Sequence, residues 1–172
     1  MARYRTVVSS QTAQLSGAPS GLTVNGYIGY WGASATAGFR IRRILAYLRA
    51  GAGVPTSQQV SIQIHRQTVA PAGTGLAAAV LGQPMEVWTP QTDPTVGVIV
   101  TTATTIGTTG PTIAANPIGD IGLNAQNTVD HPIEFTEELV CSIGTANGIA
   151  FVNSAATLNA SHLIRLDIEI EV

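Results

Sequence analysis

The chain has few charged side chains and no lysine. Of its 172 residues, 10% are charged and 45% are hydrophobic, whereas about a quarter of an ordinary soluble domain is charged. A surface this poor in charge is unfavourable for a freely diffusing monomer, because charge keeps proteins soluble. The composition therefore indicates a protein whose surface is partly covered by neighbouring molecules.

All eight basic residues are arginine. Two explanations stay open: a genomic base composition that also raises Ala and Gly, or the use of the planar arginine fork at interfaces. The formal net charge is −2 and the pI is near 5.8. Because no arginine run could follow a phosphate backbone, nucleic acid is not an expected partner.

Cysteine, long apolar runs and catalytic motifs are also scarce. The single Cys141 excludes an internal disulfide and a cysteine-based zinc site. No apolar run approaches the ~20 residues of a membrane span, and the opening MARYRTVVSSQT has no apolar segment typical of a secretory signal. We therefore expect no membrane partner and no secretory signal.

The sequence has no nucleophile elbow, phosphate loop or dinucleotide fingerprint. Residues 130–134 (DHPIE) could hold a divalent cation, or form a polar turn that enters a strand. The three histidines, His65, His131 and His162, are far apart, and none is part of a His-x-His pair. We expect His65 at the surface or an interface and Cys141 in the core, with no catalytic residue, no metal and no cofactor.

Strand patterns dominate what is present. In residues 163–172 branched apolar residues alternate with charged ones: Ile164, Leu166, Ile168, Ile170 and Val172 against Arg165, Asp167, Glu169 and Glu171. Residues 60–65 alternate in the same way, and residues 96–105 are rich in Val and Thr. A period of two indicates half-buried strands.

Two Asn-Gly pairs indicate turns. Asn147-Gly148 predicts a two-residue type I′ hairpin that pairs residues 143–146 with residues 149–152. Asn25-Gly26 predicts a similar turn between residues 22–24 and 27–30.

Two segments are harder to interpret. The apolar residues of segment 39–49 fit helical spacing (Ile41, Ile44, Leu45, Leu48) as well as strand spacing (Phe39, Ile41, Leu45, Tyr47). Segment 95–129 contains one charged residue, Asp120, and many Gly and Pro residues, which predicts loops with one or two short strands. Many short strands with Gly/Pro turns indicate an all-β sandwich or barrel, here a single domain over 1–172 with residues 1–20 as a candidate extended arm.

The order of these segments resembles the small jelly-roll structural proteins of tailed bacteriophages. The similarity covers roughly residues 39–172, and departs from that order in the long segment 95–129. The segments that carry it are Arg40–Ile44, Val60–Arg66, Gly73–Gly75, Asp93–Pro94, Pro132–Leu139, Ile143–Val152 and Leu163–Val172.

The resemblance implies a jelly-roll-like antiparallel β-sandwich in which segment 39–49 is a strand. It further implies a virion structural protein that decorates or cements the capsid surface, or a minor capsid protein. Its partners would be the major capsid lattice and other copies of itself in a trimer or another cyclic oligomer. No functional residue transfers from the family.

The candidate interface residues are Arg40, Arg42, Arg43, Tyr30 and Trp31. Strict alternation would send Arg40 and Arg42 to one face of a strand and Arg43 to the other. Tyr27, Tyr30 and Trp31 cluster near the first Asn-Gly pair, where aromatic side chains could instead stack on sugars. A carbohydrate- or receptor-binding jelly-roll module is therefore the alternative function, and a small β-barrel enzyme is a third.

Overall fold

The computed structural model describes residues 3–9, 27–50, 57–69, 86–87, 99–102, 112–124, 128–132, 139–154 and 162–172. Within these ranges every regular element is a β-strand. The same ranges contain no helix with the length and apolarity needed to cross a membrane.

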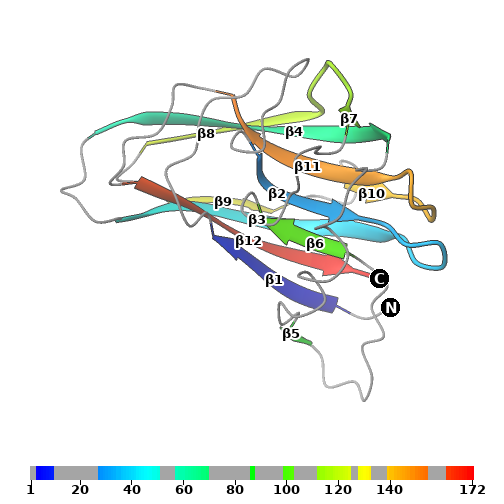
Figure 1. Cartoon of the computed structure of the whole chain (residues 1–172). Coiled ribbons are helices and arrows are strands. Elements are labelled where there is room, and N and C mark those ends of the chain that lie inside the picture. The colour runs from blue at the N-terminus through cyan, green and yellow to red at the C-terminus, as the bar shows by residue number, and fades with distance from the viewer. Residues whose placement is uncertain are drawn as a thin grey trace.

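The described strands form two packed antiparallel sheets (Figure 1). Sheet A has the order β10-β3-β12-β1-β5, with β9 also on β3. Sheet B has the order β6-β2-β11-β4-β7, with β8 also on β4. Sheet A contains β1 (Arg3–Ser9), β3 (Phe39–Ala50), β5 (Glu86–Val87), β9 (Val129–Pro132), β10 (Leu139–Cys141) and β12 (His162–Glu171). Sheet B contains β2 (Tyr27–Gly32), β4 (Gln59–Val69), β6 (Ile99–Thr102), β7 (Thr112–Ile113), β8 (Gly119–Asn124) and β11 (Gly148–Asn153). The predicted all-β sandwich is confirmed, and its jelly-roll character stays a prediction.

The core lies between the two sheets. The apolar side of β12 is buried as the alternation predicts, and so are Val60, Ile62 and Ile64 of β4. Trp31 and Phe151 meet edge to face in sheet B, with ring centroids 5.1 Å apart. Cys141 is also part of this core, which confirms the expectation for the only cysteine.

A β-bulge at Arg42 explains why segment 39–49 looked ambiguous. On β12, Ile170 pairs with Ile41 and Glu169 pairs with Arg43, so Arg42 is the extra residue. Ile41 and Ile44 therefore both face the core although they are three positions apart, which is also a helical spacing. The expectation that Arg43 faces away from Arg40 and Arg42 is wrong, because the bulge leaves all three on the outer face of sheet A.

The predicted hairpin at Asn147-Gly148 is wrong. β10 belongs to sheet A and β11 to sheet B, so residues 142–147 connect the sheets and do not join two paired strands. The turn lies earlier, where the Asn147 amide donates to the Gly144 carbonyl at 2.9 Å. Gly144, at φ +126°, is the only residue with a positive φ in the described part of the chain.

The other expectations on chain organisation have mixed outcomes. Residues 3–9 of the expected N-terminal arm form β1, between β12 and β5 in sheet A. Segment 95–129 contains three described strands before β9, which exceeds the expectation of one or two. Asn25-Gly26 lies outside the described residues.

Candidate functional site

The charged side chains of the described residues gather on the outer face of sheet A. Eight charged side chains whose placement the structure describes lie there, on β3, β9 and β12: Arg40, Arg42, Arg43, Asp130, Arg165, Asp167, Glu169 and Glu171. Two others, Arg66 and Asp120, belong to sheet B. The inward neighbours of these residues on β12 are the buried core residues Ile164, Leu166, Ile168 and Ile170. Sheet A therefore has one apolar face toward the core and one charged face away from it. On the charged face Asp167 and Glu171 are buried, while Arg43 and Asp130 are exposed.

Residues of opposite charge alternate from strand to strand in the backbone register of sheet A. The backbone register aligns Arg43, Glu169, Arg5 and Glu86 in one row over β3, β12, β1 and β5. A second row aligns Arg40, Glu171 and Arg3. Opposite charges at facing positions of neighbouring strands stabilise a sheet by roughly 0.2–1 kcal/mol per pair, whereas like charges destabilise it. The register therefore places residues of opposite charge at facing positions of neighbouring strands.

Arg43 of β3 forms ion pairs with both neighbouring strands, β9 and β12. Its Nε and Nη2 donate to the two carboxylate oxygens of Asp130 at 2.8 and 2.6 Å, and its Nη1 donates to Glu169 Oε1 at 3.3 Å. These hydrogen bonds raise the pKa of Arg43 and lower that of Asp130. Because both side chains are exposed, the pairs orient charges more than they stabilise the fold.

The bulge residue Arg42 makes a less exposed ion pair. Its Nε lies 2.5 Å from Glu171 Oε2, and the two side chains are 20% and 10% exposed. Further along β12, the Arg165 guanidinium lies 5.7 Å from the centroid of the Tyr47 ring. The bulge thus has a chemical consequence, because it aims Arg42 at Glu171 on the outer face.

The structure separates the five candidate interface residues. Arg40, Arg42 and Arg43 lie together on the outer face of sheet A. Trp31 is buried in the core and Tyr30 is buried in sheet B, where its hydroxyl donates to Gln67 Oε1. Burial raises the pKa of this phenol. Neither aromatic side chain is on an open surface.

The other candidate residues are His65 and the segment 130–134. His65 is buried, which corrects its expected surface position: its Nδ1 lies 2.9 Å from the Ala114 carbonyl oxygen and its Nε2 lies 3.2 Å from Gln63 Oε1. Asp130 is on β9 and pairs with Arg43, while residues 133–134 lie outside the described ranges. Within the described ranges, no three His, Cys, Asp or Glu side chains are grouped so that they could hold a metal ion.

One end of the sandwich forms a second feature that the sequence did not reveal. The loops 33–38 and 142–147, which we call the tip, are joined by backbone hydrogen bonds from Ala33 to Asn147 (3.0 Å) and from Gly144 to Ser34 (2.8 Å). Both loops lack charged residues. The signal that could have indicated them is a pair of short uncharged runs, SATAG and SIGTAN, next to core strands.

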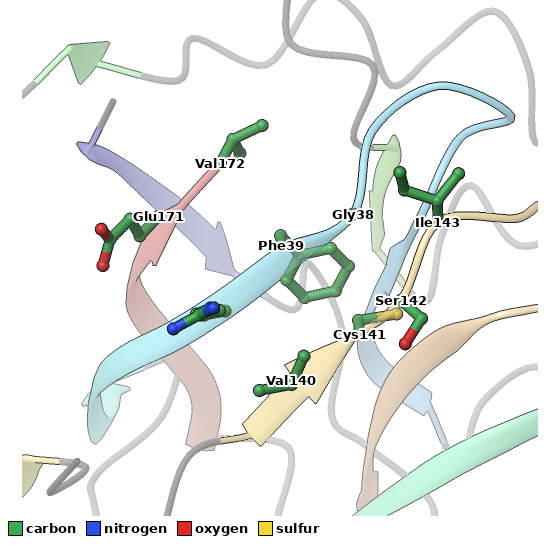
Figure 2. A pocket seen from close by; sticks show the side chains of 9 residues that line it. Gly38, Phe39, Val140, Cys141, Ser142, Ile143, Glu171 and Val172 are labelled. Atoms are coloured by element: carbon green, nitrogen blue, oxygen red, sulfur yellow. The ribbon is translucent and has the colours of Figure 1, made fainter. Parts of the chain in front are cut away.

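A hollow of about 280 Å³ adjoins the tip (Figure 2). Its lining comes from both loops of the tip, the start of β3, the end of β10 and the last two residues of the chain: Gly38, Phe39, Arg40, Val140, Cys141, Ser142, Ile143, Glu171 and Val172. Burial raises the pKa of the Cys141 thiol to about 11. Most of the lining residues are thus apolar, and the Cys141 thiol is in its protonated form at neutral pH.

Neither protein-family models nor curated proteins give a match to this sequence. Function is therefore inferred from the charged face of sheet A and from the tip.

Proposed function

We propose that this protein is a structural component of a tailed-phage particle, a capsid decoration or minor capsid protein without a catalytic role. In this proposal it has a jelly-roll-like fold and associates with copies of itself into a trimer or another cyclic oligomer. It then binds the assembled capsid lattice at the virion surface. The resemblance of residues 39–172 to such proteins motivates the proposal, and the outer face of sheet A is the observation that carries it.

A face with internally paired charges suits contact with another protein. When water is excluded from an interface, a charge that loses its only partner costs several kcal/mol. On this face Arg42 pairs with Glu171, and Arg43 pairs with both Asp130 and Glu169. These charges keep their partners when the face is covered, and their alternating pattern can still select one orientation of the partner.

The aromatic residues favour this proposal over the carbohydrate-binding alternative. A glycan-binding groove needs two or more exposed aromatic side chains. Tyr30, Trp31, Phe39 and Phe151 are all buried, and the half-buried Tyr47 lies beside Arg165. These five aromatic side chains are thus packed within the protein and do not form a sugar platform.

The proposed role is mechanical. A protein that binds only the assembled lattice, and not free subunits, stabilises the lattice by RT ln(1 + [L]/Kd), which is about 2.7 kcal/mol at a hundredfold excess over Kd. The contact energy is thereby available to resist disassembly.

Co-sedimentation of the purified protein with undecorated phage capsids tests the proposal. We expect saturable binding, and capsids that disassemble at a higher temperature when the protein is bound. Asp130→Arg places two arginines side by side on the charged face and should weaken this binding. Asp120→Arg is the matched control, because Asp120 is an exposed carboxylate on β8 of sheet B.

Two results would contradict the proposal. One is a protein that ignores capsids yet is retained on a glycan column, which would favour the alternative. The other is equal weakening by Asp130→Arg and Asp120→Arg, which would show that sheet A is not the contact face.

A further inference from the structure

We infer that the tip is a self-association surface, at which Ile143 of each copy enters the hollow of a second copy across a two-fold axis. This inference deepens the self-association part of the proposed function. It specifies two-fold symmetry for the contact and does not depend on capsid binding.

Ile143 is the protruding element of this contact. It is 60% exposed, and the only other exposed large hydrophobic side chain in the described part of the chain is Ile118, at 40%. Removing an exposed isoleucine side chain from water lowers the free energy of the system. Ile143 therefore has a reason to be covered.

The hollow is the receiving element, and it lies on the same patch. Phe39, Val140 and Val172 contribute apolar lining, and Ile143 itself stands at the border, as Figure 2 shows. In a two-fold contact the same patch meets itself, so each copy must carry both the protrusion and the hollow. The tip meets this requirement, whereas a contact with an unrelated partner needs only one of the two.

The charged residues at the margin of the hollow face each other on neighbouring strands of one copy. Arg40 and Glu171 both line it, while the loops on its other side have no charge. Glu171 already pairs with Arg42 of its own chain, so this carboxylate keeps its partner when a second copy covers the hollow. An apolar centre with a charged margin is also the usual composition of protein interfaces.

The tip is ordered before any partner arrives. Ser34 Oγ accepts hydrogen bonds from the amides of Thr36 and Ala37 at 3.1 and 2.8 Å, and Asn147 Nδ2 donates to the Ser142 and Ile143 carbonyls at 3.1 and 3.0 Å. The backbone that carries Ile143 is thus fixed by the Asn147 side chain. Association at such a surface loses little conformational entropy, which favours affinity.

Sedimentation velocity over a concentration series, without capsids, tests the inference. We expect reversible association of the wild-type chain and roughly tenfold weaker association of Ile143→Ser, a typical effect for a central interface residue. Ile118→Ser is the matched control, because it removes the other exposed isoleucine at a site outside the tip, and it should leave association unchanged.

A second variant adds a bulky side chain beside the hollow, whereas Ile143→Ser removes an apolar one. Ser142 is exposed beside the hollow, so Ser142→Trp should block association while the melting temperature stays near that of the wild type. A wild-type chain that stays monomeric at every concentration would overturn the inference. So would Ile143→Ser and Ser142→Trp chains that associate as the wild type does.

Capsid co-sedimentation of the same variants separates this inference from the proposed function. Chains that associate through the tip yet never bind capsids would refute the capsid role alone. If Ile143→Ser loses capsid binding but keeps its self-association, the tip contacts the lattice and the self-association inference is wrong.

Discussion

Replacing Gly148 by alanine should destabilise the protein by overpacking and not by backbone strain. Gly148 is in β11 directly opposite Gly32 of β2, and its φ is not positive. The Tyr30 side chain occupies the space over this glycine pair. A Cβ on Gly148 would lie 2.6 Å from Tyr30 Cε2 and 2.6 Å from Gln67 Oε1. Both contacts are too short, so the two side chains would have to move.

The expected magnitude combines two effects. Overpacking a well-filled site costs about 1–3 kcal/mol. Moving Tyr30 away from Gln67 also leaves two buried polar groups without each other, which costs about 1–3 kcal/mol. We expect a loss of roughly 2–6 kcal/mol, or a fall in melting temperature of about 4–24 °C for a domain of this size.

Thermal and urea unfolding measure this effect, with Gly122→Ala as the matched control. Gly122 is also a strand glycine, in β8, and a Cβ there would meet nothing within 4 Å. That substitution should be neutral or stabilising by about 0.4–1 kcal/mol, because alanine restricts the unfolded chain.

Tyr30 supplies the second control. In a Tyr30→Ala background most of the obstruction is gone, so Gly148→Ala should cost at least 1 kcal/mol less than in the wild type, within the range of coupling seen for contacting residues. Equal unfolding of Gly148→Ala and Gly122→Ala, or an unchanged cost without the Tyr30 ring, would refute the packing explanation.

The structure also predicts how four other changes affect folding, acid stability and thiol reactivity. Deleting Ile168–Val172 should abolish soluble folding, because Ile168 and Ile170 are fully buried and together contribute about 3–6 kcal/mol of a typical 5–15; removing Val172 alone should lower the melting temperature far less. Asn147→Gly should cost about 1–2 kcal/mol in urea unfolding, because it removes both bonds to the loop carbonyls; an unchanged midpoint would contradict this. Since Arg43 lowers the pKa of Asp130, the stabilising pair is intact above the ordinary carboxyl pKa and is lost as the pH falls through the lowered value, so Asp130→Asn should reduce the acid sensitivity of unfolding. Cys141, buried with a pKa of about 11, should react with an aromatic disulfide reagent at pH 8 only after denaturation; rapid reaction of the native protein would show that the hollow opens.

Alternation along a strand was sufficient to predict β12 and β4 but not β3. In β12 every second residue faces the core, so the sequence shows the buried face directly. In β3 the bulge at Arg42 shifts the period by one residue between Ile41 and Ile44. A bulge depends on the partner strand, which lies more than a hundred residues away, so the local sequence cannot distinguish it from a helical spacing.

The Asn-Gly pair failed for a related reason. A local turn preference indicates that the chain can reverse its direction, but it does not determine which strands then pair. Here β10 pairs with β3 and β11 pairs with β2 and β4, so the connection between β10 and β11 crosses from one sheet to the other. The glycine at position 148 is required by the Tyr30 ring above it, a contact between residues that are distant in sequence.

The patterns also predicted which face of a strand is polar, but not whether that face is covered. His65, Asp167 and Glu171 lie on the polar sides of their strands and are nevertheless buried. Binary patterning reports only the chemistry of a side chain, and burial depends on what the rest of the chain places over it.

The scarcity of charge acquires a different meaning in three dimensions. The composition suggested a surface poor in charge everywhere, yet the described charges are concentrated on the outer face of sheet A and paired over long sequence distances: Arg43 reaches Asp130 and Glu169, 87 and 126 positions away. Concentrating charge on one face leaves the loops of the tip uncharged.

A molecule with one ionic face and one preformed end whose loops are uncharged has two chemically different contact surfaces. They would respond oppositely to salt, because screening weakens contacts between charges while excluded salts strengthen apolar burial. Raising the concentration of sulfate should therefore favour association at the tip while it weakens binding through sheet A, and a parallel response of both would show that a single surface serves both contacts.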